Sequence, residues 1–398
     1  MQRLPRRLVK ISFAFGMTLL LFLVSCRGRK GQDVSSVLDQ NPKNGVEVSQ
    51  NLFRYAKNVA AYPTDYGYYM DVLNPWDSTA SLGRFAFVNE GHKGVEVADD
   101  KAVVVQLPVQ TVVSFSSTQW SVFMQLGEIS RVKGILEGRY VHDPKMTALL
   151  KDGLVKDVGT ESAMDIESLI KMRPDIVLYS PYFDGNQTNL QVTGAALFPF
   201  ADYLETTPLG RAEWIRVVGL MTGRQQEADA WFDEIEARYQ ALSNLCAKVP
   251  QRPTVFSDLA FNGQWYIAGG QSYIAKLFAD AGADYIWKDN TSTASFPLDS
   301  ESILAQAKHA DYWRVANSTS LPMTYESLKR ENAIYGLFDA YKNHKILVCD
   351  IQETGYFEKS QIEPDVLLAD FIYFFHPEVM AEYQPDYQPK YYHLMGDQ

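Results

Sequence analysis

One stretch decides the fold: Gln226–Lys248, which reads QEADAWFDEIEARYQALSNLCAK. Its apolar residues recur every three or four positions and so share one side of a helix, whereas most of its acidic residues take the other side. The apolar set is Ala228, Trp231, Phe232, Ile235, Tyr239, Leu242, Leu245 and Cys246. Pro250 and Pro253 end the run. The pattern predicts one amphipathic helix of roughly 34 Å at ~1.5 Å per residue, preceded by a shorter helical run from Pro208 to Gly223.

The segments on either side of this helix follow one plan. Before it, Thr111–Phe115 has the β-branched and aromatic character of a strand and leads into a helical run that closes at Leu126-Gly127. After it, Thr254–Ser257 opens in the same way, and its helical run closes at Ala281–Ala283. The likeness suggests two structural units of similar construction.

A second pair of segments strengthens this interpretation. Asp165–Ile170 leads to the β-rich run Pro174–Leu178, and Asp299–Leu304 leads to Asp311–Val315. In both, an Asp stands where a helix N-cap is expected and a Glu falls in the first turn. We therefore predict an α/β protein with two α/β lobes joined by a single long helix; the alternative is one larger α/β domain with chance similarity.

The rest of the chain completes the expected domain organisation. Residues 52–107 contain aromatic and β-branched runs separated by turn residues, which predicts a small β-rich extension on the first lobe. The first lobe is expected at 108–205, the linking helices at 206–250 and the second lobe at 251–390. Residues 26–51 are polar and lack periodicity, so they suit a flexible tether.

The N-terminus has the features of a signal peptide, expected at residues 1–25. Four basic residues open it, a 14-residue apolar run follows from Ile11 to Val24, and the run is short for a membrane span, which needs about 20 apolar residues. Leu23-Val24-Ser25-Cys26 resembles a bacterial lipobox, which implies that Cys26 is lipidated and anchors the protein in a lipid bilayer. An uncleaved membrane anchor is the alternative.

Composition excludes some functions. Removal of residues 1–25 takes away four positive charges and no negative ones, so the formal charge changes from −11 to −15. An acidic protein of this kind is not expected to bind nucleic acid. Two cysteines then remain, Cys246 and Cys349, each within an apolar pattern, which favours buried free thiols over a disulfide.

The motifs of catalysis and metal binding are missing from the sequence. The six histidines are scattered, there is no Cys pair with metal-ligand spacing, and no nucleotide-binding glycine motif or nucleophile elbow occurs. We therefore expect no catalytic residues, no resident metal and no cofactor.

Aromatic and hydroxyl side chains instead gather in the loops that follow the expected strands. Ligands of open α/β sheets bind outside the carboxyl ends of the strands, so these loops are the candidate ligand site. The candidate residues are Ser116, Ser117, Thr118, Tyr140, His142, Tyr182, Trp265, Tyr266, Phe296 and Tyr356. Ordinary packing is the alternative for each one; together they favour a cleft for a planar or bulky ligand.

With these features, the chain resembles the periplasmic substrate-binding proteins of ABC importers, in the group that carries iron-siderophore complexes, haem or cobalamin. The resemblance runs from about Val109 to the end of the second lobe and rests on Asp165–Ile170, Pro174–Val177, Leu126-Gly127, Val132–Ile135 and the long helix. It implies a metal-complex ligand held between the lobes. The extension at 52–107 is no part of the family pattern.

The resemblance also implies partners and a location. In the family a Glu on each lobe docks onto arginines of the ABC permease, and by position these are Glu167 and Glu301. A Glu in a first helical turn also complements the helix dipole without any partner. The resemblance implies a monomer that is periplasmic or at the cell surface, anchored as a lipoprotein and delivering its ligand to an inner-membrane permease.

Two other functions stay open at this stage. One is an enzyme on the same scaffold, such as a tetrapyrrole metal chelatase, for which His142 with Tyr140, or Glu358 with Tyr356, could begin an acid–base cluster. The other is an anchored sensor or adhesin that uses the extension as its contact surface.

Overall fold

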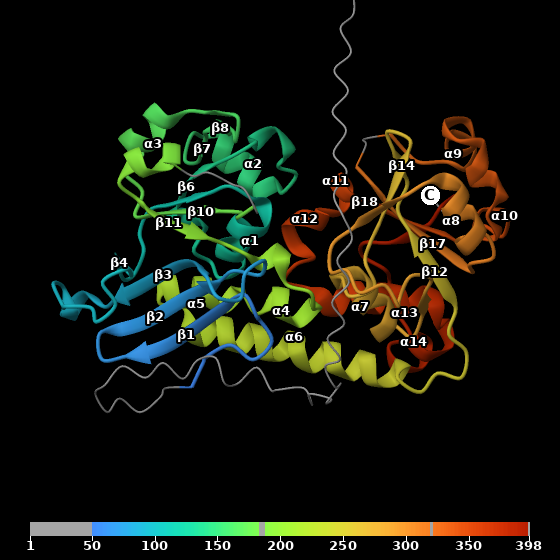
Figure 1. The fold of residues 1–398 in the computed structure, drawn as a ribbon, viewed down its shortest axis with the longest axis horizontal. Helices are drawn as coiled ribbons and strands as arrows, with labels where there is room; N and C mark the ends of the chain where they lie inside the picture. The colour runs from blue at the N-terminus through green and yellow to red at the C-terminus, as the bar shows by residue number, and fades with distance from the viewer. Residues whose placement is uncertain (1–49, 183–187, 319–320, 397–398) are drawn as a thin grey trace, which may run out of the picture. The chain divides into compact units, whose positions relative to one another are not determined.

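The computed structural model describes residues 50–182, 188–318 and 321–396, and Figure 1 shows how their elements are arranged. The expected signal peptide, the lipidation site Cys26 and nearly all of the expected tether lie outside the described residues. Within these ranges, no helix combines the length and the apolarity needed to cross a bilayer.

The predicted long helix is α6, Gln225–Cys246, with 22 residues. Its buried side is formed by Ala228, Phe232, Ile235, Tyr239, Leu242 and Cys246, as the sequence periodicity indicates. It contacts α5 (Ile215–Thr222), which follows the short helix α4 (Pro208–Ala212), and farther along it contacts α13 (Pro364–Phe375). Figure 1 shows α6 running beneath both halves of the molecule. The expectation of two α/β lobes linked by one long helix is confirmed.

The first lobe contains a five-stranded parallel sheet in the order β11-β10-β5-β6-β7. Its strands are β5 (Val112–Ser114), β6 (Val132–Ile135), β7 (Lys156–Asp157), β10 (Ile176–Tyr179) and β11 (Ala196–Pro199). Its helices are α1 (Ser117–Gln125), α2 (Pro144–Lys151) and α3 (Ile166–Met172), and β8 (Gly159–Thr160) pairs with β9 (Ala163–Met164). The central strands are buried on both faces, as expected for a parallel sheet covered by helices.

The second lobe contains the sheet β15-β12-β17-β18-β19, in which only β19 is antiparallel to its neighbour. Its strands are β12 (Thr254–Ser257), β15 (Asp284–Tyr285), β17 (Tyr312–Asn317), β18 (Ile346–Asp350) and β19 (His393–Leu394). Its further helices are α7 (Tyr273–Asp280), α8 (Ser300–Ala307), α9 (Tyr325–Glu331), α10 (Asp339–Lys342), α11 (Ile351–Thr354), α12 (Tyr356–Lys359) and α14 (Pro377–Tyr383). Cys349 in β18 and Cys246 in α6 are buried free thiols.

The two lobes share one strand order, β11-β10-β5-β6 in the first and β18-β17-β12-β15 in the second. The opening strand of each lobe lies beside the strand that follows its Asp-capped helix. Asp165 accepts a hydrogen bond from the Ser168 backbone N–H at 3.0 Å and begins α3, and Asp299 accepts one from Ser302 at 2.8 Å and begins α8. The internal likeness found in the sequence is therefore structural.

The extension is a four-stranded sheet in the order β1-β2-β3-β4. Its strands are β1 (Val59–Thr64), β2 (Gly67–Leu73), β3 (Ser81–Val88) and β4 (Val103–Gln106). Phe85 and Phe87 of β3 pack against Phe198 of β11, with ring centroids 4.7 and 6.3 Å apart. The extension is thus built onto the first lobe through aromatic contacts.

A strap, Asn51–Asn58, fastens the extension to the linking helices. Glu213, whose side chain is fully buried, accepts hydrogen bonds from the backbone N–H groups of Arg54, Tyr55 and Ala56 at 2.7–2.9 Å. Glu205 accepts in the same way from the next two residues of the strap. Buried carboxylates that bind backbone N–H groups form strong, charge-assisted hydrogen bonds, so the strap is held firmly.

The second lobe departs from the sequence prediction after β12. A helix is expected to follow the strand, but β13 (Ala260–Phe261) and β14 (Gln264–Ile267) form a hairpin first, and β14 also pairs with β16 (Phe296–Leu298). The expectation that Trp265 contacts a ligand is wrong, because side chains alternate along β14 and Trp265 is fully buried against Phe256 and Trp313.

Candidate functional site

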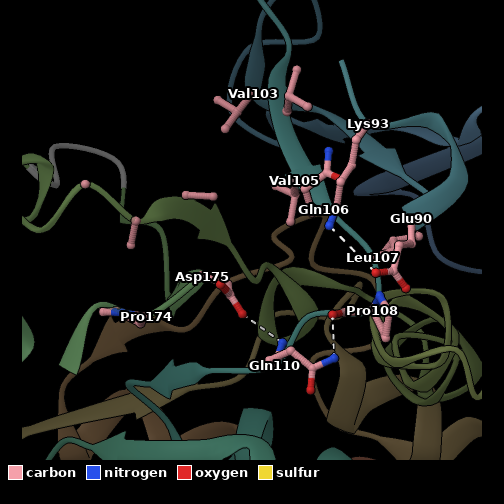
Figure 2. A pocket seen from close by; sticks show the side chains of 14 residues that line it. Glu90, Lys93, Val103, Val105, Gln106, Leu107, Pro108, Gln110, Pro174 and Asp175 are labelled. Carbon is pink, nitrogen blue, oxygen red and sulfur yellow. Dashed lines mark hydrogen bonds and ion pairs between the residues drawn. The ribbon is translucent and has the colours of Figure 1, made fainter. Parts of the chain in front are cut away.

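Two cavities lie at opposite ends of the strands of the first lobe. The first, of about 520 Å³, lies between β4 and the amino ends of β5, β10 and β11. Figure 2 shows Val103 and Gln106 of β4 on one side of it and Pro174 and Asp175 on the other. Ligands of α/β sheets bind at the carboxyl ends of strands, so this cavity is the weaker candidate.

The second cavity, of about 480 Å³, lies at the carboxyl ends of β5, β6 and β10. Four of the residues predicted from the sequence line it together: Ser116, Ser117, Tyr140 and Tyr182. Glu137, Glu161 and Ser180 also line it and were not among the residues predicted from the sequence. Glu137 and Ser180 follow β6 and β10, so the carboxyl-end rule could have found them, whereas Glu161 lies in the turn between β8 and β9, outside the parallel sheet. We call this cavity the cleft cavity.

The first wall of the cleft cavity is held in place by Gln119 of α1. Its buried side-chain oxygen accepts hydrogen bonds from the backbone N–H groups of Phe115 (3.0 Å) and Ser116 (3.2 Å), and its amide donates to the Ser180 hydroxyl at 3.3 Å. Ser116 in turn caps α1. The hydroxyl groups of this wall are thus positioned before any ligand arrives.

The two tyrosines give the cleft cavity exposed aromatic faces. Tyr140 is 57% exposed and has the Arg139 guanidinium 4.7 Å from its ring centre, and Tyr182 is 49% exposed. Burial, followed by the nearby charges of Glu161 and Glu137, raises the pKa of the Tyr182 hydroxyl, so it stays protonated as a hydrogen-bond donor. Exposed aromatic faces beside hydroxyl donors suit a bulky ligand with polar edges.

The remaining predicted residues do not join this cavity. Thr118 is buried in α1, and His142 is exposed but does not line the cavity. In the second lobe Tyr266 is exposed on β14 and Phe296 is half-buried on β16. The expectation of a ligand contact by Tyr356 is wrong, because its ring is buried against Tyr391 and Phe357.

The lobes meet beside the cleft cavity through α12. The Glu358 carboxylate accepts hydrogen bonds from the backbone N–H groups of His142 (2.8 Å) and Asp143 (3.1 Å), and Ser117 donates to the carbonyl of Phe357 at 3.4 Å. Glu358 is itself buried. It therefore connects the two lobes and is not available as the acid or base of a catalytic pair with Tyr356.

We expect Glu358→Ala to loosen this connection between the lobes. A hydrogen bond to a charged group contributes roughly 1.5 to 3 kcal/mol, so losing the carboxylate should raise the population of open forms by more than tenfold. Electron-spin distance measurements between labels at Lys151→Cys in α2 and Lys329→Cys in α9 should show a longer, broader distribution. Glu353→Ala, at an exposed position in α11, is the control. Identical distributions in all three proteins would show that Glu358 does not hold the lobes together.

The described residues contain no group of three or more His, Cys, Asp or Glu side chains arranged to hold a metal ion. What the site presents is a preformed wall of hydroxyl groups and two tyrosine faces next to the junction of two lobes. This arrangement is one for binding.

Comparison with known proteins agrees with this geometry. Residues 112–353, more than half of the 398-residue chain, match the model of the family described as periplasmic binding protein. The chain belongs to the periplasmic binding protein family, and is therefore a binding protein and not an enzyme.

Individual relatives are similar to the chain over most of its length. It is 28% identical over 367 residues to an uncharacterized lipoprotein of Methanocaldococcus jannaschii, and the matched region covers 85% of each chain. It is 22% identical to a cobalamin-binding protein of Halobacterium salinarum over 69% of this chain and 72% of that one. A periplasmic heme-binding protein of Pseudomonas aeruginosa shares the fold, with a TM-score of 0.52 and 19% identity. The match covers 71% of this chain and 95% of that one.

Proposed function

We propose that this protein is the lipid-anchored substrate-binding component of an ABC importer. It captures a metal-centred complex, an iron siderophore, haem or cobalamin, between its lobes and delivers it to a permease in the membrane. Glu167 on α3 and Glu301 on α8 dock onto the permease.

The observation that carries this proposal is the position of the cleft cavity. It lies at the carboxyl ends of the first lobe's strands, beside the α12 segment of the second lobe, and presents hydroxyl groups and two exposed tyrosine rings. Its volume of about 480 Å³ suits part of a large ligand whose other face would contact the second lobe. The cobalamin-binding relative and the heme-binding structural neighbour support a metal-centred ligand.

The anchor is proposed from the sequence and from one relative. Leu23-Val24-Ser25-Cys26 follows a short apolar run, and the Methanocaldococcus relative is named a lipoprotein. A diacyl group on Cys26 would hold the protein stably on a membrane, since two acyl chains are needed for lasting attachment. The tether would then let the lobes reach the permease.

Purification of the full chain from the membranes of its own host tests the proposal. Native mass spectrometry should give the mass of a chain that begins at Cys26 and carries a lipid, together with one bound metal complex. The ultraviolet-visible spectrum should then show the absorption of a ferric chelate, a haem or a corrinoid. A water-soluble chain that carries no metal complex, and gains none when these complexes are added, would refute the proposal.

A further inference from the structure

Building on the proposed function, we propose that the cleft selects metal complexes without net negative charge. Its ligand would be a neutral or cationic complex, such as a corrinoid or a cationic ferric hydroxamate, and a polyanionic ferric chelate would be rejected. The charges that surround the cleft cavity carry this inference.

The wall from the first lobe is acidic. Glu137 and Glu161 line the cleft cavity, and no described residue that lines it is Lys, Arg or His. Both carboxylates act electrostatically on the Tyr182 hydroxyl, so their fields reach the cavity. A polyanionic ligand placed there would be repelled by both.

Arg139, in the described loop beside this wall, does not act as a free cation. Arg139 is the cation next to Tyr140, but its guanidinium lies on that ring and 3.9 Å from the Glu137 carboxylate. Arg139 and Glu137 therefore offset each other in part, and Glu161 contributes the larger share of the negative charge that this wall presents to a ligand.

The carboxyl ends of the second lobe's strands carry Asp258 after β12, Asp350 at the end of β18 and the buried Arg314 of β17. Asp258 and Arg314 offset each other because they form an ion pair, and the Asp350 carboxylate lies 3.7 Å from the His393 imidazole. The Arg314 guanidinium pairs with Asp258 at 2.7 Å and donates to the Tyr392 hydroxyl at 2.8 Å. A buried, paired arginine cannot neutralise an incoming anion without leaving its own partner unpaired.

The polar groups that remain suit uncharged ligand atoms. The hydroxyls of Ser116, Ser117 and Ser180 can donate to amide or hydroxamate oxygens, and the faces of Tyr140 and Tyr182 attract apolar rings and cations. The formal charge of −11 for the whole chain adds a long-range field of the same sign. The cleft therefore discriminates by charge as well as by shape.

Equilibrium dialysis with three probes of different charge tests the inference. The probes are cyanocobalamin, which is neutral, ferrioxamine B, which is a cation, and ferric enterobactin, which is a trianion. We expect the neutral or the cationic probe to bind at least about tenfold more tightly than the trianion. The carboxylates that line the cleft cavity would repel all three negative charges of the trianion at short range. The double variant Glu137→Gln/Glu161→Gln should strengthen binding of the trianion by roughly tenfold and change cyanocobalamin binding by less than about twofold.

Glu382→Gln, at an exposed position in α14, is the matched control and should change nothing. The inference is overturned if the trianion binds as tightly as the best of the other two probes, or if the double variant leaves its affinity unchanged. If none of the three probes binds, this inference fails, whereas the proposed function fails only if the protein from its own host also carries and gains no metal complex. The two failures are thus distinguishable.

Discussion

We expect Glu213→Gln to lower the free energy of unfolding by about 3 kcal/mol, because it removes a buried charge from a site built around it. The Glu213 carboxylate is fully buried and accepts hydrogen bonds from the backbone N–H groups of Arg54, Tyr55 and Ala56. It also pairs with the Arg216 guanidinium at 3.0 Å. The glutamine side-chain amide can accept fewer of these hydrogen bonds, and its own N–H groups would face the backbone N–H groups of the strap. Arg216 would also lose its buried partner, although it keeps ion pairs with Asp229 at 2.9 Å and Asp233 at 3.1 Å.

Chemical denaturation with urea measures this effect, and Glu227→Gln is the matched control. Glu227 lies in the first turn of α6 and pairs with Arg224 at 2.9 Å, but both side chains are about half exposed. Exposed pairs of this kind contribute about 0 to 1 kcal/mol, so the control should unfold close to the wild type. If both variants lost the same small amount, the strap would not depend on the buried carboxylate.

The second large effect is expected on transport. Glu167 is 78% exposed and pairs with Lys171 one helical turn away, at 2.6 Å, and Glu301 is exposed in the first turn of α8. The caps that begin these helices are Asp165 and Asp299, so folding does not rely on the glutamates. Each adds about 0.3 to 1 kcal/mol through the helix dipole, whereas losing one partner of a desolvated pair with a permease arginine costs about 2 to 5 kcal/mol.

Ligand uptake by cells carrying the cognate permease separates these two roles. Uptake should fall at least about tenfold with Glu167→Ala or Glu301→Ala and further in the double variant, since 1.4 kcal/mol corresponds to a factor of ten. Melting temperature and ligand affinity should stay near those of the wild type. Glu326→Ala is the control, because Glu326 is an exposed first-turn Glu of another capped helix, α9. Normal uptake by the double variant would leave the docking role without support.

Features that depend on local sequence could be predicted. The stripe of α6 follows from its periodicity, and the two Asp caps follow from the chemistry of helix starts. The strand loops of the first lobe were also found, which is why Ser116 and Tyr182 were expected at the cleft cavity. In each case the physical signal lies within a few residues of the feature.

Features that depend on distant contacts could not be predicted. Glu213 and Glu358 each bind backbone N–H groups more than 150 residues away, and a lone Glu in a helical pattern looks like a solvated residue. Trp265 was misplaced for a different reason. Asn262-Gly263 is a hairpin-turn signal, and both residues have positive φ, so recognising it would have placed Trp265 on a strand with alternating burial.

Calorimetric titration of the host-derived complex tests whether the cleft cavity holds the metal complex. We expect binding of one complex per chain to the wild type, and roughly a hundredfold weaker binding to Tyr140→Ser/Tyr182→Ser, which loses both aromatic faces. Tyr383→Ser, at an exposed tyrosine of α14, should bind like the wild type. Equal affinity of all three proteins would show that the ligand binds elsewhere and not in the cleft cavity.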